Sequence, residues 1–265
     1  MKKLVSVLLA LSLALMCVSA LAADELYGKV MEKGTLVIGT EGMWSPWTYH
    51  DLDTNELTGF DVELGRAICA KLGIEAKFTE TAWDAILAAL DSKRVDTMIN
   101  GVEVTEERAQ KYDFTIPYCY VRTALVVRGD NDTIQDFEDL KGVKTANSIG
   151  STYMTLAESY GAVAYGVDTL DETMEMVLSG RAAATLNAVD SIGDYLRVHP
   201  NANIKIVALT KEASPVAIPM RKGESSMVEA VNKAIEELRA DGTLSELSIR
   251  FFGNDITSVP EDEQE

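Results

Sequence analysis

The chain has 265 residues, of which 24 are basic and 42 acidic, so its formal net charge at pH 7 is −18. This charge makes nucleic acid and anionic lipid surfaces poor partners, because both are negatively charged. The three cysteines and two histidines do not occur in a spacing typical of zinc sites. The sequence therefore predicts neither a metal site nor a cofactor.

The N-terminal segment has the pattern of a secretion signal. Two lysines precede an apolar run over residues 4–16, and Ala20-Leu21-Ala22 offers small residues for cleavage. The run is shorter than the ~20 residues that a membrane-spanning helix needs. We therefore expect residues 1–22 to be removed and the protein to be exported to the periplasm.

The cysteines leave two alternatives open. Lipidation of Cys17 would give a cell-surface lipoprotein, but Met16 is bulky where that processing site prefers a small residue. Cys69 and Cys119 remain in the mature chain. They either form a disulfide, which export permits, or stay as two buried thiols.

Apolar strand patterns alternate with helical patterns from residue 34 onward, which is typical of β/α units around a mostly parallel sheet. The clearest helix covers 60–72, where apolar residues recur at helical spacing and Gly73 follows. Further elements of this first unit are expected as strands at 35–39, 74–80 and 95–99 and a helix at 83–92.

A second, similar unit is expected farther along the chain. Before it, Thr105 can cap a short helical turn that contains Arg108 and begins with acidic residues. The patterns then predict strands at 124–127, 143–146, 183–187 and 204–207, and helices at 134–140, 153–160, 170–178 and 190–198.

Segments 216–219 and 228–238 have no partner in the second unit, so we expect the chain to return to the first unit. It then crosses between two lobes twice, near 118–121 and near 214–220, which leaves a cleft between the lobes. The predicted organisation is α/β, with lobe 1 (23–120), lobe 2 (121–214), a return segment of lobe 1 (215–256) and a disordered acidic tail (257–265).

A series of motifs, in order along nearly the whole mature chain, resembles the polar-amino-acid (family 3) extracellular solute-binding proteins of ABC importers. The motifs are TLVIGT at 35–40, WSPW at 44–47, LTGFDV at 57–62, Trp83, VTEER at 104–108, YDFTIPY at 112–118, DLKG at 139–142 and FFG at 251–253. The resemblance implies a two-lobed periplasmic-binding-protein-like fold of type II and a monomer that delivers a small amino acid to a membrane permease.

The resemblance also implies a site for the ligand carboxylate. Arg108 is similar to an arginine that clamps this group in the family, and its guanidinium fork suits two oxygens. The turn from Ser148 through Gly150, Ser151 and Thr152 is similar to a turn whose backbone N–H groups meet the same carboxylate. Two alternatives are a surface Arg108 paired with a nearby glutamate and a turn that only caps a helix.

The sequence departs from the family where the ligand ammonium is bound. Relatives commonly carry two aspartates at the positions of Ala183 and Ala188, and the second accepts from the ammonium. A closed cleft needs a replacement acceptor. We expect Glu103 in this role, beside Gly101, whose carbonyl matches another ammonium contact. Glu103 is otherwise a rim residue, and two other acids, Asp190 and Glu41, are the alternative acceptors.

Trp44 and Trp83 match positions that line the pocket for the ligand side chain, although Trp83 also fits an ordinary core position. Aromatic faces accommodate a flat or cationic group, or a disulfide. Glu41 matches a carboxylate that contacts a polar or cationic ligand end. These residues favour a polar L-amino acid that is arginine-like or cystine-like.

Two other functions fit the sequence less well. A few relatives are cyclohexadienyl dehydratases, and Glu103 would then be an acid in the cleft, but no Ser/His/Asp set, metal cluster or phosphate loop supports catalysis. A receptor sensor would need a membrane span or signalling domain after Phe252, where only a short acidic segment follows. We therefore expect a binding protein, not an enzyme.

Overall fold

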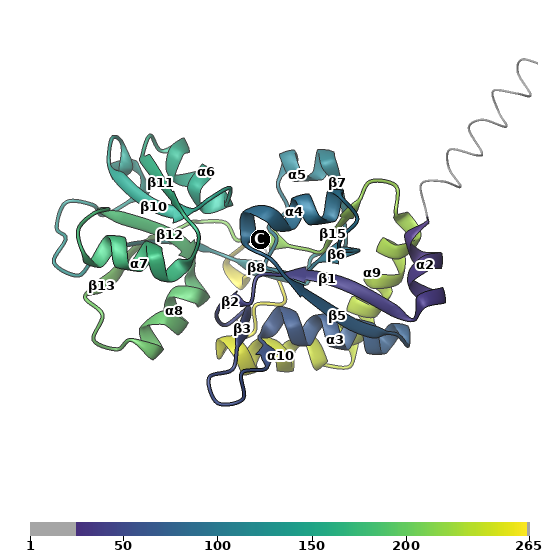
Figure 1. Cartoon of the computed structure of the whole chain (residues 1–265). Coiled ribbons are helices and arrows are strands. Elements are labelled where there is room, and N and C mark those ends of the chain that lie inside the picture. The colour runs from purple at the N-terminus through teal and green to yellow at the C-terminus, as the bar shows by residue number, and fades with distance from the viewer. Residues whose placement is uncertain (1–24, 264–265) are drawn as a thin grey trace, which may run out of the picture.

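The computed structural model describes residues 25–263. They form two α/β lobes that lie side by side (Figure 1), which is the predicted fold class. The expected secretion signal (1–22) lies outside the described residues. Within residues 25–263, no helix has the length and apolar composition needed to cross a membrane.

The first lobe is built on a parallel sheet with the strand order β5–β1–β6. β1 pairs with β5 along its whole length and with β6 through its second half. The elements of this lobe before the first crossing are α2 (Leu26–Lys33), β1 (Thr35–Thr40), β2 (Met43–Trp44), β3 (Thr48–His50), β4 (Leu57–Thr58), α3 (Phe60–Leu72), β5 (Glu75–Glu80), α4 (Trp83–Asp91), β6 (Thr97–Met98), α5 (Glu106–Lys111) and β7 (Tyr112–Phe114).

Helix α3 confirms the clearest sequence prediction, because it covers the expected residues 60–72. It begins after Gly59, where an added Cβ would lie 2.3 Å from the carbonyl oxygen of Trp47. It ends at Gly73, whose left-handed conformation lets its N–H reach the last carbonyl groups of the helix.

The second lobe contains a five-stranded sheet in the order β11–β10–β12–β9–β13. β10 is parallel to β11 and β12, whereas β9 is antiparallel to β12 and β13. The sequence did not predict β11, a mostly apolar edge strand in which Val163 and Tyr165 are exposed. The bounds are β9 (Thr123–Arg128), η1 (Phe137–Leu140), β10 (Lys144–Ser148), α6 (Thr152–Ser159), β11 (Val163–Val167), α7 (Leu170–Leu178), β12 (Ala184–Ala188), α8 (Val189–Val198) and β13 (Ile204–Leu209).

Two strands join the lobes. β8 (Cys119–Val121) and β14 (Ser214–Val216) pair antiparallel, in the segments where the crossings were expected. After the second crossing, β15 (Pro219–Arg221) pairs with β7 of the first lobe. Helices α9 (Ser225–Ala240) and α10 (Thr243–Phe252) then pack against α3, so the chain returns to the first lobe.

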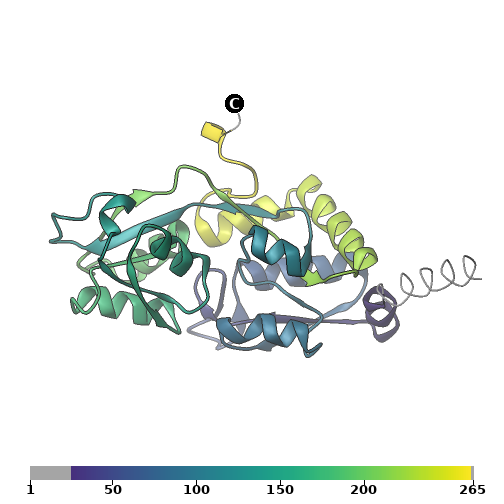
Figure 2. The ribbon, with the colours of Figure 1, turned by 90° about the horizontal axis from the view of Figure 1, so that it is seen from above.

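The C-terminal segment differs from the expected disordered tail (257–265) as far as Glu263. It runs over the junction of the lobes (Figure 2) and ends in the short helix η2 (Glu261–Glu263). Arg122 donates to the carboxylates of Asp262 at 2.5 Å and Glu263 at 2.8 Å, and Glu263 also accepts from the backbone N–H of Ala213. An acidic composition suggested disorder, but the fold brings a cation to these acids.

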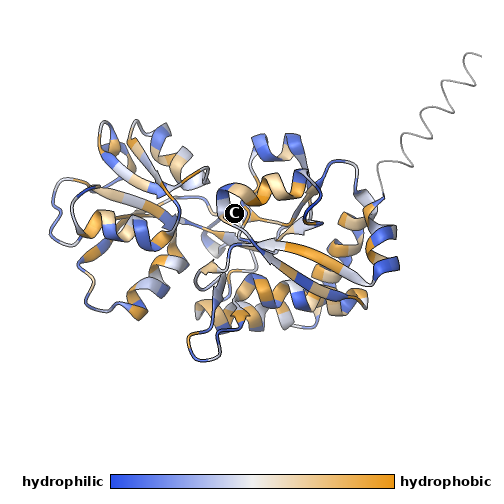
Figure 3. Cartoon of the chain, viewed as in Figure 1, coloured by the Kyte–Doolittle hydropathy of each residue, from blue (hydrophilic) through white to orange (hydrophobic). Residues whose placement is uncertain are grey.

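An aromatic cluster supports the loop between β2 and β3. Trp47 is fully buried, and its ring lies 4.8 Å from that of Phe252, which in turn lies 4.9 Å from Phe60. Helices in this part of the molecule have distinct hydrophobic and hydrophilic sides in Figure 3. The cluster fixes the loop onto α3 and α10, and it therefore fixes Trp44, which precedes the loop.

Cys69 and Cys119 are both buried free thiols. Burial raises the pKa of Cys69 to about 12 and that of Cys119 well above its ordinary value. Because the thiolate is the reactive form, we expect a thiol reagent at mildly alkaline pH to modify neither residue in the folded protein. Unfolding should expose both, and their failure to react after unfolding without reductant would instead indicate a disulfide.

Candidate functional site

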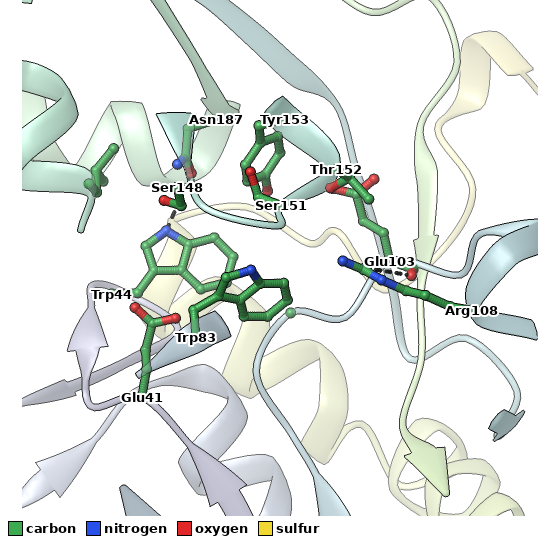
Figure 4. Close-up of a pocket in the computed structure, with 12 residues that line it drawn as sticks. Glu41, Trp44, Trp83, Glu103, Arg108, Ser148, Ser151, Thr152, Tyr153 and Asn187 are labelled. Atoms are coloured by element: carbon green, nitrogen blue, oxygen red, sulfur yellow. Dashed lines mark hydrogen bonds between the residues drawn. The ribbon is translucent and has the colours of Figure 1, made fainter. Parts of the chain in front are cut away.

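The lobes meet around a narrow cavity. Figure 4 shows the side chains that converge on it from both lobes. The first lobe contributes Glu41, Trp44, Trp83, Gly101, Glu103 and Arg108, and the second contributes Ser148, Ser151, Thr152, Tyr153, Leu170 and Asn187. All charged residues in this lining therefore come from the first lobe.

Every residue predicted for the site lines this cavity except Gly150. Gly150 lies beside it, in a wider cleft between α5 and α6. Tyr153, Leu170 and Asn187 were not predicted as site residues. Only Asn187 had a signal in the sequence, because it precedes Ala188 in the run where the family usually has an acid.

Trp44 is held on several sides. Its ring stacks on Trp47, with centroids 5.1 Å apart and planes 9° from parallel. Its Nε1 donates to Oδ1 of Asn187 in the second lobe at 3.3 Å. Gly101 lies against the same ring and has a φ of +57°, a conformation that favours glycine. Because Trp47 and Gly101 belong to the first lobe, these two contacts hold the indole independently of lobe closure.

Arg108 enters the cavity from α5, whose first turn is capped by Thr105. Its Nη1 donates to the backbone carbonyl of Glu103 at 3.0 Å, and its guanidinium lies 5.5 Å from the ring centre of Trp83. None of the ion pairs found within residues 25–263 includes Arg108, and Glu107 pairs with Lys111 instead. Burial lowers the pKa of Arg108, but the group stays cationic.

Glu103 is only 6% exposed and lies close to the hinge, where its backbone bridges to Val216. Its Oε1 accepts from the hydroxyl of Thr152, in the second lobe, at 2.8 Å. The hydroxyls of Ser214 and Tyr153 stabilise the same carboxylate, whereas burial, the stronger influence, raises its pKa. Glu103 is thus a buried acid at the boundary of the lobes and not an exposed rim residue.

Glu41 lies at the other end of the cavity in Figure 4. Burial raises its pKa to about 7, although Asn100 donates to its carboxylate at 2.8 Å. Asp190, the other alternative acceptor, does not line the cavity, and its carboxylate accepts from Asn254. Glu103 and Glu41 are therefore the two acids in position to meet a cation there.

The turn before α6 is a helix cap. The side chain of Ser151 accepts from the backbone N–H of Met154 at 3.1 Å. The first N–H groups of a helix have no partner within the helix and favour an anion. Because Ser151 and Thr152 also line the cavity, this turn can cap the helix and bind a carboxylate at once.

Polar contacts join the lobes next to the cavity. Ser45 donates to Asp194 at 2.7 Å, and Nε1 of Trp47 donates to Ser191 at 3.1 Å. Both donors lie in the loop fixed by the aromatic cluster. Together with the Trp44–Asn187 and Glu103–Thr152 hydrogen bonds, these contacts show that the lobes are closed on each other.

Known proteins resemble the chain over nearly its whole length. The model of the bacterial extracellular solute-binding proteins, family 3, matches residues 36–254. A probable amino-acid ABC transporter-binding protein of Haemophilus influenzae is 41% identical over 235 residues, which are 89% of this chain and 91% of that protein.

Two solved structures differ in their overall similarity to this one. An ancestral arginine-binding protein bound to arginine has a TM-score of 0.78 at 37% identity, covering 83% of this chain and 99% of its own. The L-cystine solute receptor of Neisseria gonorrhoeae, unliganded and open, has a TM-score of 0.61 at 41% identity, covering 88% and 99%. The lower score at higher identity agrees with closed lobes in the present structure.

Gly101 offers a direct test of how Trp44 is held. An added Cβ would lie 2.5 Å from Cζ3 of Trp44, so we expect Gly101→Ala to displace the indole and shift tryptophan emission to longer wavelengths. Gly142→Ala is the matched control, because its φ is +73° and nothing lies near its Cβ position. Both changes should destabilise the fold by about 1–2 kcal/mol. Equal emission spectra would contradict the prediction.

Proposed function

The chain belongs to the bacterial extracellular solute-binding proteins of family 3, and on this premise we propose how it binds a polar L-amino acid for an ABC importer. It is the extracytoplasmic binding component, has the two-lobed type II fold, and passes its ligand to a membrane permease. The similar proteins reported above are binding proteins, not enzymes. We further propose that residues 1–22 direct export to the periplasm and that the protein acts as a monomer.

Arg108 is proposed to bind the ligand carboxylate. It is a partly buried cation that lines the cavity, and the carbonyl of Glu103 orients its guanidinium. Within residues 25–263 it forms no ion pair. A carboxylate between this guanidinium and the turn at Ser151 and Thr152 would receive donors from both lobes. Such a ligand group therefore favours closure.

Glu103 is proposed to accept from the ligand ammonium, together with the carbonyl of Gly101. Ala188 is fully buried on β12 and carries no acceptor in its side chain, so the second lobe offers only neutral polar groups here. A carboxylate has about four lone-pair positions, and three hydroxyls occupy some of those on Glu103. Room for an ammonium N–H remains.

The far end of the ligand is assigned to Glu41, Trp44 and Trp83. Two indoles and a carboxylate suit a guanidinium, and they also suit the disulfide and second ammonium of cystine. We therefore propose an arginine-like or cystine-like ligand, with its amino-acid end at Arg108 and its other end at Glu41. Hinge closure through β8 and β14 would then enclose it.

Calorimetry with a panel of L-amino acids tests this function. We expect the protein to bind arginine, cystine or another polar member, and Arg108→Ala to weaken that binding about a hundredfold or more through loss of a buried charged partner. Arg66→Ala is the matched control, because Arg66 pairs with Glu63 on the exposed side of α3. Failure of every amino acid to bind would refute the proposal.

The raised pKa of Glu41 predicts a pH dependence. A cationic ligand end binds the ionised carboxylate, so below the pKa of about 7 binding must expel a proton. The affinity for L-arginine should therefore fall as the pH drops, by at most about tenfold per unit, and level off above about pH 8. Calorimetry in buffers of different ionisation enthalpy should detect the released proton.

Glu41→Gln should remove this slope and the proton release. An unchanged slope in the variant would show that a different group is responsible.

A further inference from the structure

Glu103 lies where three parts of the molecule meet. Its backbone follows β6 of the first lobe and bridges to Val216 of the second crossing. Its side chain reaches Thr152 and Tyr153 at the start of α6 and Ser214 at the start of β14. Glu41, the other acid that lines the cavity, accepts a hydrogen bond from Asn100 of its own lobe. Glu103 is therefore sensitive to whether the lobes are closed.

The closed arrangement buries this carboxylate without a cation in direct contact. Thr152 donates from 2.8 Å, and the other nearby donors are also hydroxyls. Arg108 of α5 and Tyr153 of α6 are the other titratable groups that act on it, but Arg108 donates to the backbone carbonyl of Glu103. Burying a charge that has no oppositely charged group in direct contact is unfavourable, although Arg108 acts on it from a distance.

Opening the lobes changes this balance in two opposite ways. It removes the hydrogen bonds from Thr152 and Tyr153, which belong to the second lobe, and it lets water solvate the carboxylate. A bound cation next to Glu103 would cancel the cost of burial and leave the hydrogen bonds in place. The same side chain thus opposes closure of an empty cleft and supports closure of a filled one.

We propose that Glu103 couples recognition of the ligand ammonium to closure of the lobes. This inference rests on the proposed function, because it assigns the compensating cation to the ligand. It also gives a reason for the alanine at 188, because the acid lies on the first lobe instead. From there, ammonium binding affects the hinge through Ser214 and the second lobe through Thr152. Whether the lobes are open or closed then depends on whether an ammonium group is bound.

Variants at both ends of the Glu103–Thr152 contact distinguish two roles for Glu103: coupling of ammonium binding to lobe closure, and a hydrogen bond that only stabilises the closed form. Glu103→Gln keeps an acceptor for Thr152 but removes the charge, so the empty protein should close more readily. We expect its closed-to-open ratio to rise about tenfold or more, while its affinity for L-arginine or L-cystine falls by a similar factor. Thr152→Val keeps the charge and loses the contact, so its closed-to-open ratio should fall.

Lobe distances can be measured by pulsed electron spin resonance. Labels at Gln110→Cys and Glu158→Cys would lie on exposed positions of α5 and α6, and the thiols of Cys69 and Cys119 are buried. Glu224→Gln is the matched control. Glu224 is a buried glutamate that accepts from Leu26 at 2.8 Å within the first lobe, so its variant should leave the lobe distance unchanged.

The results distinguish four cases. Opposite shifts in the empty Glu103→Gln and Thr152→Val proteins support the coupling. A lower closed-to-open ratio in both variants would show that the contact only stabilises the closed form. Weaker binding with an unchanged ratio in Glu103→Gln would show that Glu103 accepts from the ligand without affecting closure. Either result overturns the inference. If no amino acid binds the unaltered protein, the proposed function fails, and the distances in the empty proteins still test the coupling.

Discussion

Two opposite charges in the cleft, Arg108 and Glu103, are held apart by the protein itself. The guanidinium donates to the backbone carbonyl of Glu103, while the carboxylate is bound by hydroxyls. Because the two side chains do not pair directly, each keeps part of its binding capacity within a largely buried site. A molecule with one anionic and one cationic group satisfies both, which is the chemistry of the amino-acid backbone.

The first lobe holds this site rigid. Packing of Trp47 with Phe252 and Phe60 fixes the loop that carries Trp44, and Gly101 lets the Trp44 ring lie directly against the backbone. Asp61 accepts from the N–H of Gly101 at 2.5 Å and from Tyr118 at 2.8 Å, so the segment leading to Glu103 is anchored to α3. Preorganised groups lose little conformational entropy on binding.

The second lobe has a different part in the site. It offers hydroxyl and amide groups, a helix N-terminus and Leu170, all without charge. In the proposed function, its approach would remove water and add hydrogen bonds after the first lobe has bound the charged groups of the ligand. The hinge strands β8 and β14 pair at the junction of the lobes, and the C-terminal segment is bound there to Arg122.

The sequence by itself determined the two-lobed α/β fold, the extent of α3 and the residues of the first lobe that reach the cavity, because hydrophobic spacing and ordered motifs are local signals. Tertiary structure alone decided that Glu103 contacts Thr152, 49 positions away, that Asn187 meets Trp44, and that Arg122 orders the acidic C-terminal segment. It also left Gly150 outside the cavity. These contacts depend on how two lobes and three distant segments meet, and hydrogen bonds across such distances leave no periodic pattern in the chain.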